Sequence, residues 1–332
     1  MTTANPLTDC KFCSTISKNN GEDPIGSARF TDYWLVMELP QPWTMERFQT
    51  DPVLAPMHDF FHQLHDLHIH VVPMLITPDR EYSSPDATRV MFYQKPDAMF
   101  AHFEKQEFLI QPEQIKDLAI SLFLDREQLS QFDSYRQESN DIRDIMVCTH
   151  GNVDVACARF GQPIYQQLRK EYAANSDGKL RVWRCSHFGG HQFAPTLVDL
   201  PTGQFWGHLE PEILGNLVNR DRSVSGLRRF YRGWSGLPRL AQFVEREVWM
   251  QHGWQWLDYK KIGQVIKQEP EQDSKNVEWA EVKLEYESPD GNDKGAYIAK
   301  VELSHTVDTV INSGADVVSV NQYVVSSLER VA

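Results

Sequence analysis

Four side chains that can bind a metal lie in the central part of the chain, as two pairs. Eight residues separate Cys148 from Cys157, and three residues separate His187 from His191. The two histidines flank a Gly-Gly pair. Glycine in the interior of a helix costs roughly 1 kcal/mol relative to alanine, so this stretch is predicted to be a loop. Glycine would also let the backbone come close to whatever the two histidines hold.

The spacing of these residues favours an iron–sulfur cluster over a single ion. Structural zinc sites take paired cysteines from a tight turn with about two to four residues between them, and here eight residues intervene. A cluster with two irons is wider, so ligands from two separate loops suit it better. Two cysteines and two histidines also form a Rieske centre, but the interleaved Cys-x-His pairs of that site are missing. Zinc on the same four residues is the main alternative.

A predicted strand leads into each ligand-bearing loop. IMVCTHG (145–151) is a short apolar segment that contains the first cysteine, and LRVWRCS (180–186) precedes the histidine loop. A helix is predicted between them over 157–173, and a strand pair and a helix after them over 196–201, 204–210 and 210–219. This order is that of a thioredoxin-like layout. Both loops would then follow the C-terminal ends of strands, where α/β sheets commonly place their sites.

The flanking regions have patterns of their own. Residues 1–140 alternate strands and helices, with strands predicted over 33–40, 68–78 and 88–95 and helices over 57–65 and 111–125. The charged stretch 125–144 is a plausible connector. From about 240 a helix (239–253) precedes an alternating hairpin (282–287 and 295–304). We therefore predict an α/β protein with an N-terminal α/β domain (1–140), a thioredoxin-like ferredoxin domain (141–240) and a smaller α+β C-terminal region (241–332), which would serve structure or docking.

Composition limits the partners and the compartment. The 332-residue chain has a formal net charge of −13, which disfavours nucleic acid, because phosphates require a positive surface. No stretch approaches the ~18 consecutive apolar residues of a membrane span, and the start MTTANPLTDC lacks the pattern of a secretory signal. Five cysteines are too few for a disulfide scaffold in a chain of this length. We expect a cytoplasmic protein with no nucleic-acid or membrane partner.

Three segments carry a resemblance to a known family. VCTHGNVDVACARFG (147–161) and CSHFGGHQFAPTLVDLPTGQFWGHLEPE (185–212), with NNGEDPIGSA (19–28), resemble the sucrase/ferredoxin-like family over roughly residues 5–245. The resemblance implies a thioredoxin-like ferredoxin domain with a [2Fe-2S] cluster bound by Cys148, Cys157, His187 and His191. No carboxylate pair stands in a recognisable glycosidase setting, so sugar hydrolysis is not predicted.

Histidine ligation has consequences for charge. Two thiolates neutralise the positive charge of the oxidised core, whereas four would leave the site negative. We therefore predict a potential well above the roughly −400 mV of plant-type ferredoxins. Reduction should also tighten proton binding by a ligating imidazole, so the potential should fall as pH rises. The predicted role is electron transfer with a redox protein partner, and a non-enzymatic carrier is favoured over an oxidoreductase. Because no nucleotide-binding glycine loop is found, we do not expect the chain to oxidise NAD(P)H unaided.

Other residues support alternatives. Cys10 and Cys13 form a Cys-x-x-Cys pair that would suit a thiol-dependent redox enzyme, although no strand precedes it. A zinc-stabilised interaction module is the third hypothesis. Cys185 is expected to be a buried inert thiol, and His150 either hydrogen-bonds near the cluster or lies exposed. A further group forms a basic stretch that could dock an acidic partner: Arg220, Arg222, Arg228, Arg229, Arg232 and Arg239.

Overall fold

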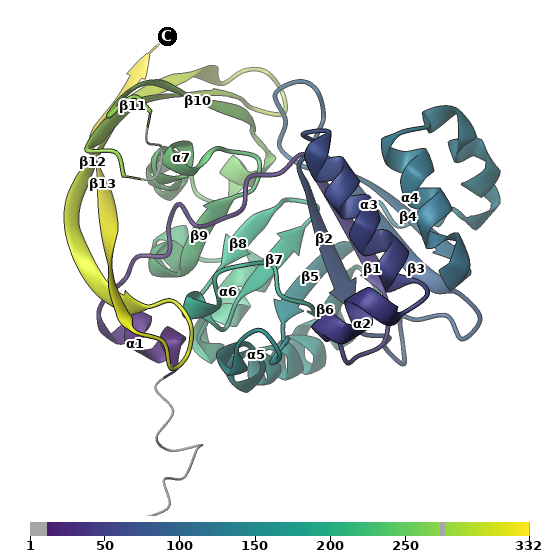
Figure 1. Ribbon diagram of the computed structural model, residues 1–332. Coiled ribbons are helices and arrows are strands. Elements are labelled where there is room, and N and C mark those ends of the chain that lie inside the picture. The colour runs from purple at the N-terminus through teal and green to yellow at the C-terminus, as the bar shows by residue number, and fades with distance from the viewer. Residues whose placement is uncertain (1–11, 273–275, 332) are drawn as a thin grey trace, which may run out of the picture.

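The computed structural model describes residues 12–272 and 276–331. A nine-stranded mixed sheet has the order β4-β3-β1-β2-β6-β5-β7-β8-β9, and a separate four-stranded antiparallel sheet has the order β10-β11-β12-β13 (Figure 1). Helices pack on both sheets, which confirms the predicted α/β class. None of the helices within the described ranges is both long and apolar enough to cross a bilayer.

The first half of the large sheet contains the predicted elements and two more. Its strands are β1 (Tyr33–Glu38), β2 (Val71–Ile76), β3 (Thr88–Gln94) and β4 (Glu104–Ile110), and its helices are α2 (Met45–Thr50), α3 (Leu54–Asp66) and α4 (Ile115–Phe123). Alternate strand residues such as Leu35 and Phe92 form a buried cluster with the apolar faces of α3 and α4. Sequence analysis missed α2 and β4. In β4 the reason is that Lys105 and Glu107 are buried, so the strand does not look apolar.

The second half repeats the layout of the first. It consists of β5 (Arg143–Cys148), α5 (Val155–Gln167), β6 (Leu180–Cys185), β7 (Leu197–Leu200), β8 (Gln204–Trp206) and α6 (Leu214–Asn219), followed by β9 (Tyr231–Trp234). β5 is parallel to β6 and antiparallel to β7, which is antiparallel to β8. The order β6-β5-β7-β8 is the predicted thioredoxin-like layout. β2-β1-β3-β4 has the same order and directions.

The two halves meet at the antiparallel strands β2 and β6, whose only register pair is Ile76 with Cys185. The sheet is therefore continuous across residue 140, where sequence analysis placed a domain boundary. The division at 140 and 240 stays a prediction about folding units.

A buried ion network also joins the halves. Asp144, at the start of β5, accepts hydrogen bonds from Arg181 Nε at 2.8 Å, Lys105 Nζ at 2.6 Å and Trp183 Nε1 at 2.9 Å. Arg181 Nη2 also donates to Glu107 Oε2 at 2.6 Å. Each of these charges has a partner of opposite sign, which is the condition under which buried charges are tolerated.

The C-terminal region is a curved sheet packed on α7 (Arg239–His252). Its strands are β10 (Lys260–Glu269), β11 (Trp279–Glu287), β12 (Lys294–Val310) and β13 (Val317–Val331). The predicted alternation holds in β11, where Val282 and Leu284 are buried, but Leu303 of β12 is 39% exposed. The ladder between β12 and β13 shifts register between Leu303 and His305, and burial resumes at Val307 and Thr309.

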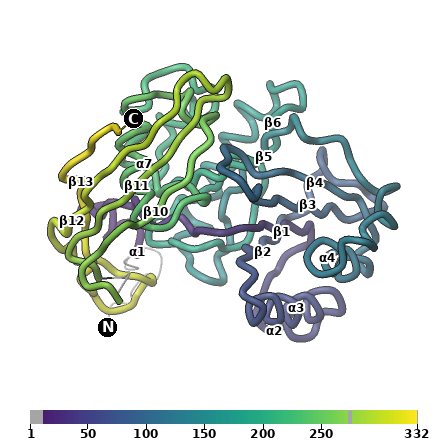
Figure 2. The backbone as a smooth tube through the Cα atoms, turned by 90° about the horizontal axis from the view of Figure 1, so that it is seen from above, coloured from purple at the N-terminus to yellow at the C-terminus, as the bar shows by residue number. Residues whose placement is uncertain are grey.

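The long hairpin formed by β12 and β13 reaches back to the beginning of the chain. Its tip, residues 311–316, lies beside α1 (Cys13–Asn19) in Figure 1. Figure 2 shows the C-terminal sheet at one end of the molecule and α2, α3 and α4 at the other. The C-terminal region therefore does not stand apart as an appendage, because the tip of its hairpin contributes to the central site.

Candidate functional site

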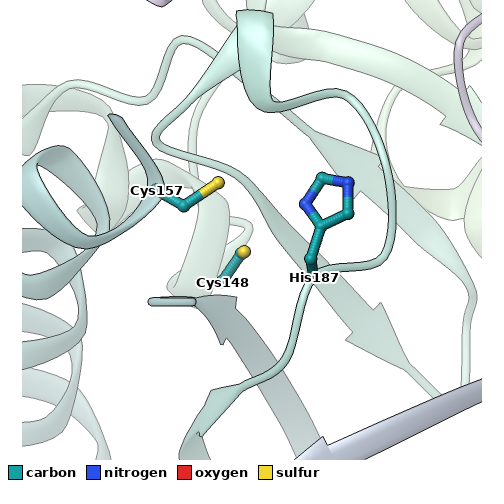
Figure 3. A group of neighbouring side chains, drawn as sticks. All are labelled: Cys148, Cys157 and His187. Atoms are coloured by element: carbon teal, nitrogen blue, oxygen red, sulfur yellow. The ribbon is translucent and has the colours of Figure 1, made fainter. Parts of the chain in front are cut away.

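Three of the four predicted ligands converge at one edge of the large sheet. Cys148 is the last residue of β5, Cys157 lies in the first turn of α5, and His187 follows β6. One ligand atom from each residue lies within 4.8 Å of the others, and Figure 3 shows a ring nitrogen of His187 turned toward both sulfurs. β5 and β6 are adjacent and parallel, so the loops after them meet at the same edge.

His191 lies next to this group without being part of the tight cluster. Its ring centroid is 5.0 Å from that of His187. Both of its ring nitrogens are buried without a hydrogen-bond partner, as is Nδ1 of His187. A buried polar atom left unpaired costs on the order of 1–3 kcal/mol, and one explanation for such atoms is an ion that is not present in the structure. The two thiols and these imidazoles are a donor set that fits a metal centre.

The two thiols shift each other's pKa in opposite directions. Cys148 and Cys157 are both buried and not disulfide-bonded. A hydrogen bond from Cys157 lowers the pKa of Cys148 to about 5, with contributions from His187 and the backbone N–H of His150. The same contact, together with burial, raises the pKa of Cys157. The contact therefore favours the thiolate on Cys148 over the thiolate on Cys157, and the thiolate is the form that binds a metal.

Gly190, between the two histidines, makes room for a buried arginine. A Cβ on Gly190 would lie 2.2 Å from Nη2 of Arg232, and both Gly189 and Gly190 have positive φ angles. Arg232 Nη1 donates to the Gly189 carbonyl at 3.0 Å, and Nε and Nη2 donate to Ser27. Burial lowers the pKa of Arg232 to about 10, so it stays charged at pH 7. Its interaction with Cys148 and Cys157 places a cation beside the thiols.

His150 supports the loop that carries His187. Its Nδ1 accepts a hydrogen bond from the His187 backbone N–H at 3.3 Å, so Nε2 carries the proton and donates to the Trp43 carbonyl at 2.8 Å. The ring is buried. Of the two roles considered for His150, the structure shows the hydrogen-bonding one. It ties the histidine loop to the first half of the molecule.

Residues of α1 and of the tip of the β12–β13 hairpin form a set of contacts next to the site. Ser313, at the tip of the β12–β13 hairpin, donates to Asp154 through its backbone N–H and its hydroxyl, both at 2.7 Å. Its hydroxyl also accepts the backbone N–H of Cys13 at 3.1 Å. The Cys13 thiol in turn lies 3.6 Å from the His191 carbonyl oxygen. The sequence gives no signal for Ser313, which is 300 residues from Cys13.

Asp154 connects these contacts to α5, the helix that contains Cys157. It is the N-cap of α5 and accepts the backbone N–H of Ala156 at 2.8 Å. Burial would raise the pKa of Asp154, but the hydrogen bonds from Ser313 and Ala156 hold it below its usual value. The carboxylate is therefore ionised at neutral pH. An N-cap preference is readable in a sequence, although the contact with the distant hairpin is not.

Two of the remaining cysteines can be placed. Cys185 is fully buried and pairs in register with Cys148 in the neighbouring strand. Burial raises its pKa well above the usual range, as expected of an inert thiol. Cys13 is also buried, at the start of α1, and burial raises its pKa to about 11. Cys10 lies outside the described residues, so the predicted Cys-x-x-Cys pair is described only in part.

The predicted basic docking stretch is wrong as a single exposed surface. Arg232 is buried at the candidate site. Arg220 pairs with the buried Asp199 at 3.1 Å, and Arg228 and Arg229 pair with Glu247 and Glu210. The aromatic residues between them are core residues: Phe230, Tyr231 and Trp234. Proximity in sequence was misleading because a 3₁₀ helix and β9 point these side chains in different directions.

Among comparisons with known proteins, the match to a family model agrees with the resemblance. A comparison with curated protein sequences returns no match. Among solved structures, the chain is similar to a thioredoxin-like [2Fe-2S] ferredoxin from Aquifex aeolicus, with 16% identity over 30% of this chain and 96% of that chain and a TM-score of 0.25. The model of the sucrase/ferredoxin-like family matches residues 24–233. Because this match spans more than half of the 332 residues, the chain belongs to the sucrase/ferredoxin-like family.

Proposed function

We propose that this protein carries electrons on a [2Fe-2S] cluster bound by Cys148, Cys157, His187 and His191. The observation that carries the proposal is a site in which two buried thiols lie within 4.8 Å of a ring nitrogen of His187, while Nδ1 of His187 and both ring nitrogens of His191 are buried without a hydrogen-bond partner. When bound, the cluster would accept and release one electron at a time. The chain's own residues would position it, exclude water and set its charge.

Several contacts suit this role. The backbone of the histidine loop donates a hydrogen bond to His150 and accepts one from Arg232, so His187 and His191 are pre-positioned. The Arg232 cation beside the thiols favours the state with the additional electron. With two neutral imidazoles as ligands, we expect a potential above that of all-cysteine clusters and coupling of reduction to proton uptake.

The thiol-dependent alternative has less support. A nucleophilic cysteine needs a lowered pKa and access to substrate, whereas Cys13 is buried and its pKa is raised to about 11. The zinc alternative uses the same four residues, and metal analysis distinguishes it from the cluster. We propose a redox protein as partner and the cytoplasm as compartment. The described cysteines are free thiols, as is usual there.

The test is elemental analysis of anaerobically purified protein together with its visible spectrum. We expect two irons and two labile sulfides per chain and a brown protein, and loss of this signal in His191→Ala. A colourless protein with one zinc per chain, or one with neither iron nor sulfide, would overturn the proposal.

A further inference from the structure

A groove of about 920 Å³ runs along β2 beside α3 and ends at His187. The topology of the sheet explains it. β2 and β6 are joined only around Ile76, where Ser186 N donates to the Leu75 carbonyl at 2.7 Å and Thr77 N donates to the Arg184 carbonyl at 3.0 Å. Earlier residues of β2 and the chain after Ser186 are not paired with each other, and the groove occupies the gap.

The walls of the groove are apolar and adaptable. Leu54, Met57 and Phe61 of α3, Trp43 and Phe48 near α2, and Met37, Val72 and Met74 of the sheet line it. Methionine side chains adjust readily to the shape of a ligand. At the rim, Phe30 is 39% and Met45 is 69% exposed, so apolar surface is left uncovered.

The charge of the lining argues against an ionic ligand. Among the residues described at the walls, Arg29 is the sole Asp, Glu, Lys or Arg, and the other titratable residues are seven histidines: His58, His62, His65, His68, His70, His150 and His187. A phosphorylated ligand such as a nucleotide would need several cations or exposed backbone N–H groups. An uncharged apolar molecule matches the lining better, and the volume lies within the range usual for small-molecule sites.

The two imidazoles His150 and His187 and the Ser186 hydroxyl line the groove near the candidate site. His150 uses both ring nitrogens in hydrogen bonds, whereas the Ser186 hydroxyl accepts the Leu75 N–H at 2.9 Å and keeps its own hydrogen as a further donor. His187 lines the groove while one of its ring nitrogens faces the sulfurs. If that nitrogen is a ligand, the other carries a hydrogen and can donate it. A molecule seated here should therefore bear an acceptor oxygen.

We propose that the groove binds an uncharged aromatic carbonyl compound, the class to which quinones belong, with its carbonyl oxygen on the second ring nitrogen of His187. The apolar part of this binding follows from the groove itself. The hydrogen bond rests on the proposed function, because it requires His187 to be a ligand. Such a molecule would lie directly beside the metal centre.

The test is calorimetric titration of the purified metal-loaded protein with 2,3-dimethyl-1,4-naphthoquinone. The two methyl groups block addition of cysteine thiols to the quinone ring. We expect one molecule bound per chain, and about tenfold weaker binding of 2,3-dimethylnaphthalene, which has the same apolar body without the oxygens. Absence of saturable binding, or equal affinity for the two compounds, would overturn the proposal.

Two exposed rim residues on different segments provide variants that spare the core. Met45→Trp narrows the groove and Phe30→Asp adds a charge to it, and each should weaken quinone binding at least tenfold. Leu124→Trp and Val317→Asp are matched controls at exposed apolar residues outside the groove and should change nothing. Unchanged binding in both groove variants would locate the ligand elsewhere. Iron and sulfide are assayed on the same samples, so cluster-containing protein that fails to bind contradicts the groove proposal alone.

Discussion

The two halves of the large sheet share one layout and differ in the loops that their strands lead into. After β5 and β6 come the cysteines and histidines of the candidate site. After β1 and β2, residues 39–44 and 77–87 contain neither cysteine nor histidine. Instead, the Glu38 carboxylate at the end of β1 accepts hydrogen bonds from the Arg89 backbone N–H and the Ser83 hydroxyl. The fold supplies strand-end loops in both halves, and the residues placed there decide whether a loop is structural or functional.

The same contrast separates two buried polar clusters. In the network around Asp144, the carboxylate has several donors and faces cations. At the candidate site, the nitrogens of His191 have no partner. A satisfied network stabilises the junction between the halves, whereas an unsatisfied one indicates that a further group binds there.

The largest expected effect is loss of the metal centre in Cys148→Ser. A hydroxyl is a poor ligand for iron, so iron content should fall by at least tenfold. Cys185→Ser is the matched control, because Cys185 is the register partner of Cys148 and equally buried. Iron analysis and the visible spectrum check both variants. Full iron content in Cys148→Ser, or loss in Cys185→Ser alone, would show that the ligand set is misassigned.

The second effect concerns stability. Asp144→Asn removes one of the two buried carboxylates, Asp144 and Glu107, that balance Arg181 and Lys105, and we expect a loss of about 3–5 kcal/mol in the free energy of unfolding. Urea titration measures it. Burial would raise the pKa of Asp144, but Arg181 and Lys105 hold it far below its usual value. Its contribution is therefore complete above about pH 4 and is lost as pH falls toward the folded-state pKa.

The Asp144→Asn variant also distinguishes the ion network around Asp144 from the candidate site. Folded Asp144→Asn protein should keep the iron content of the wild type, because Asp144 lies at the opposite end of β5 from Cys148. If the free energy of unfolding falls as steeply with decreasing pH in Asp144→Asn as in the wild type, the role given to the network is contradicted.

The third effect is on the midpoint reduction potential of the proposed cluster. Arg232→Met removes the buried cation beside the thiols, and a charge interaction of about 1–2 kcal/mol corresponds to a midpoint lower by about 40–90 mV for one electron. Arg232→Lys keeps the charge and should shift the midpoint much less. Potentiometric titration of both variants is the measurement. Equal shifts in both would mean that Arg232 acts through the shape of the Gly-Gly loop and not through its charge.

The smallest effect concerns the contacts that the tip of the hairpin makes next to the site. Ser313→Ala removes the hydroxyl contacts with Asp154 and Cys13, worth about 1 kcal/mol each. Loss of iron to a chelator should become several times faster while iron content at purification is unchanged. Ser319→Ala in β13 of the same hairpin removes an exposed hydrogen bond to Asp308 and should leave the rate as it was.

Sequence reasoning could predict what local pattern determines. Apolar runs gave β1, β3, β5 and β6, helical periodicity gave α3, α4 and α7, and residue types at fixed spacing selected the ligands. It could not predict β4, whose buried Lys105 and Glu107 look exposed until their partners are known. Nor could it find the contacts of Ser313 or the burial of Arg232, because these depend on packing between segments far apart in the chain.

The repeat of the two halves was also invisible in sequence. A shared strand order needs only apolar residues at matching positions, and many sequences meet that condition. The layout became recognisable once strand directions and neighbours were known.

Pulsed electron paramagnetic resonance of the reduced protein, labelled with ¹⁵N in its histidines, tests the central claim most directly. Two histidine ligands predict two strongly coupled ¹⁵N nuclei, and one should disappear in His191→Cys. A reduced cluster without nitrogen coupling, or a protein that gives no cluster signal at all, would contradict the account.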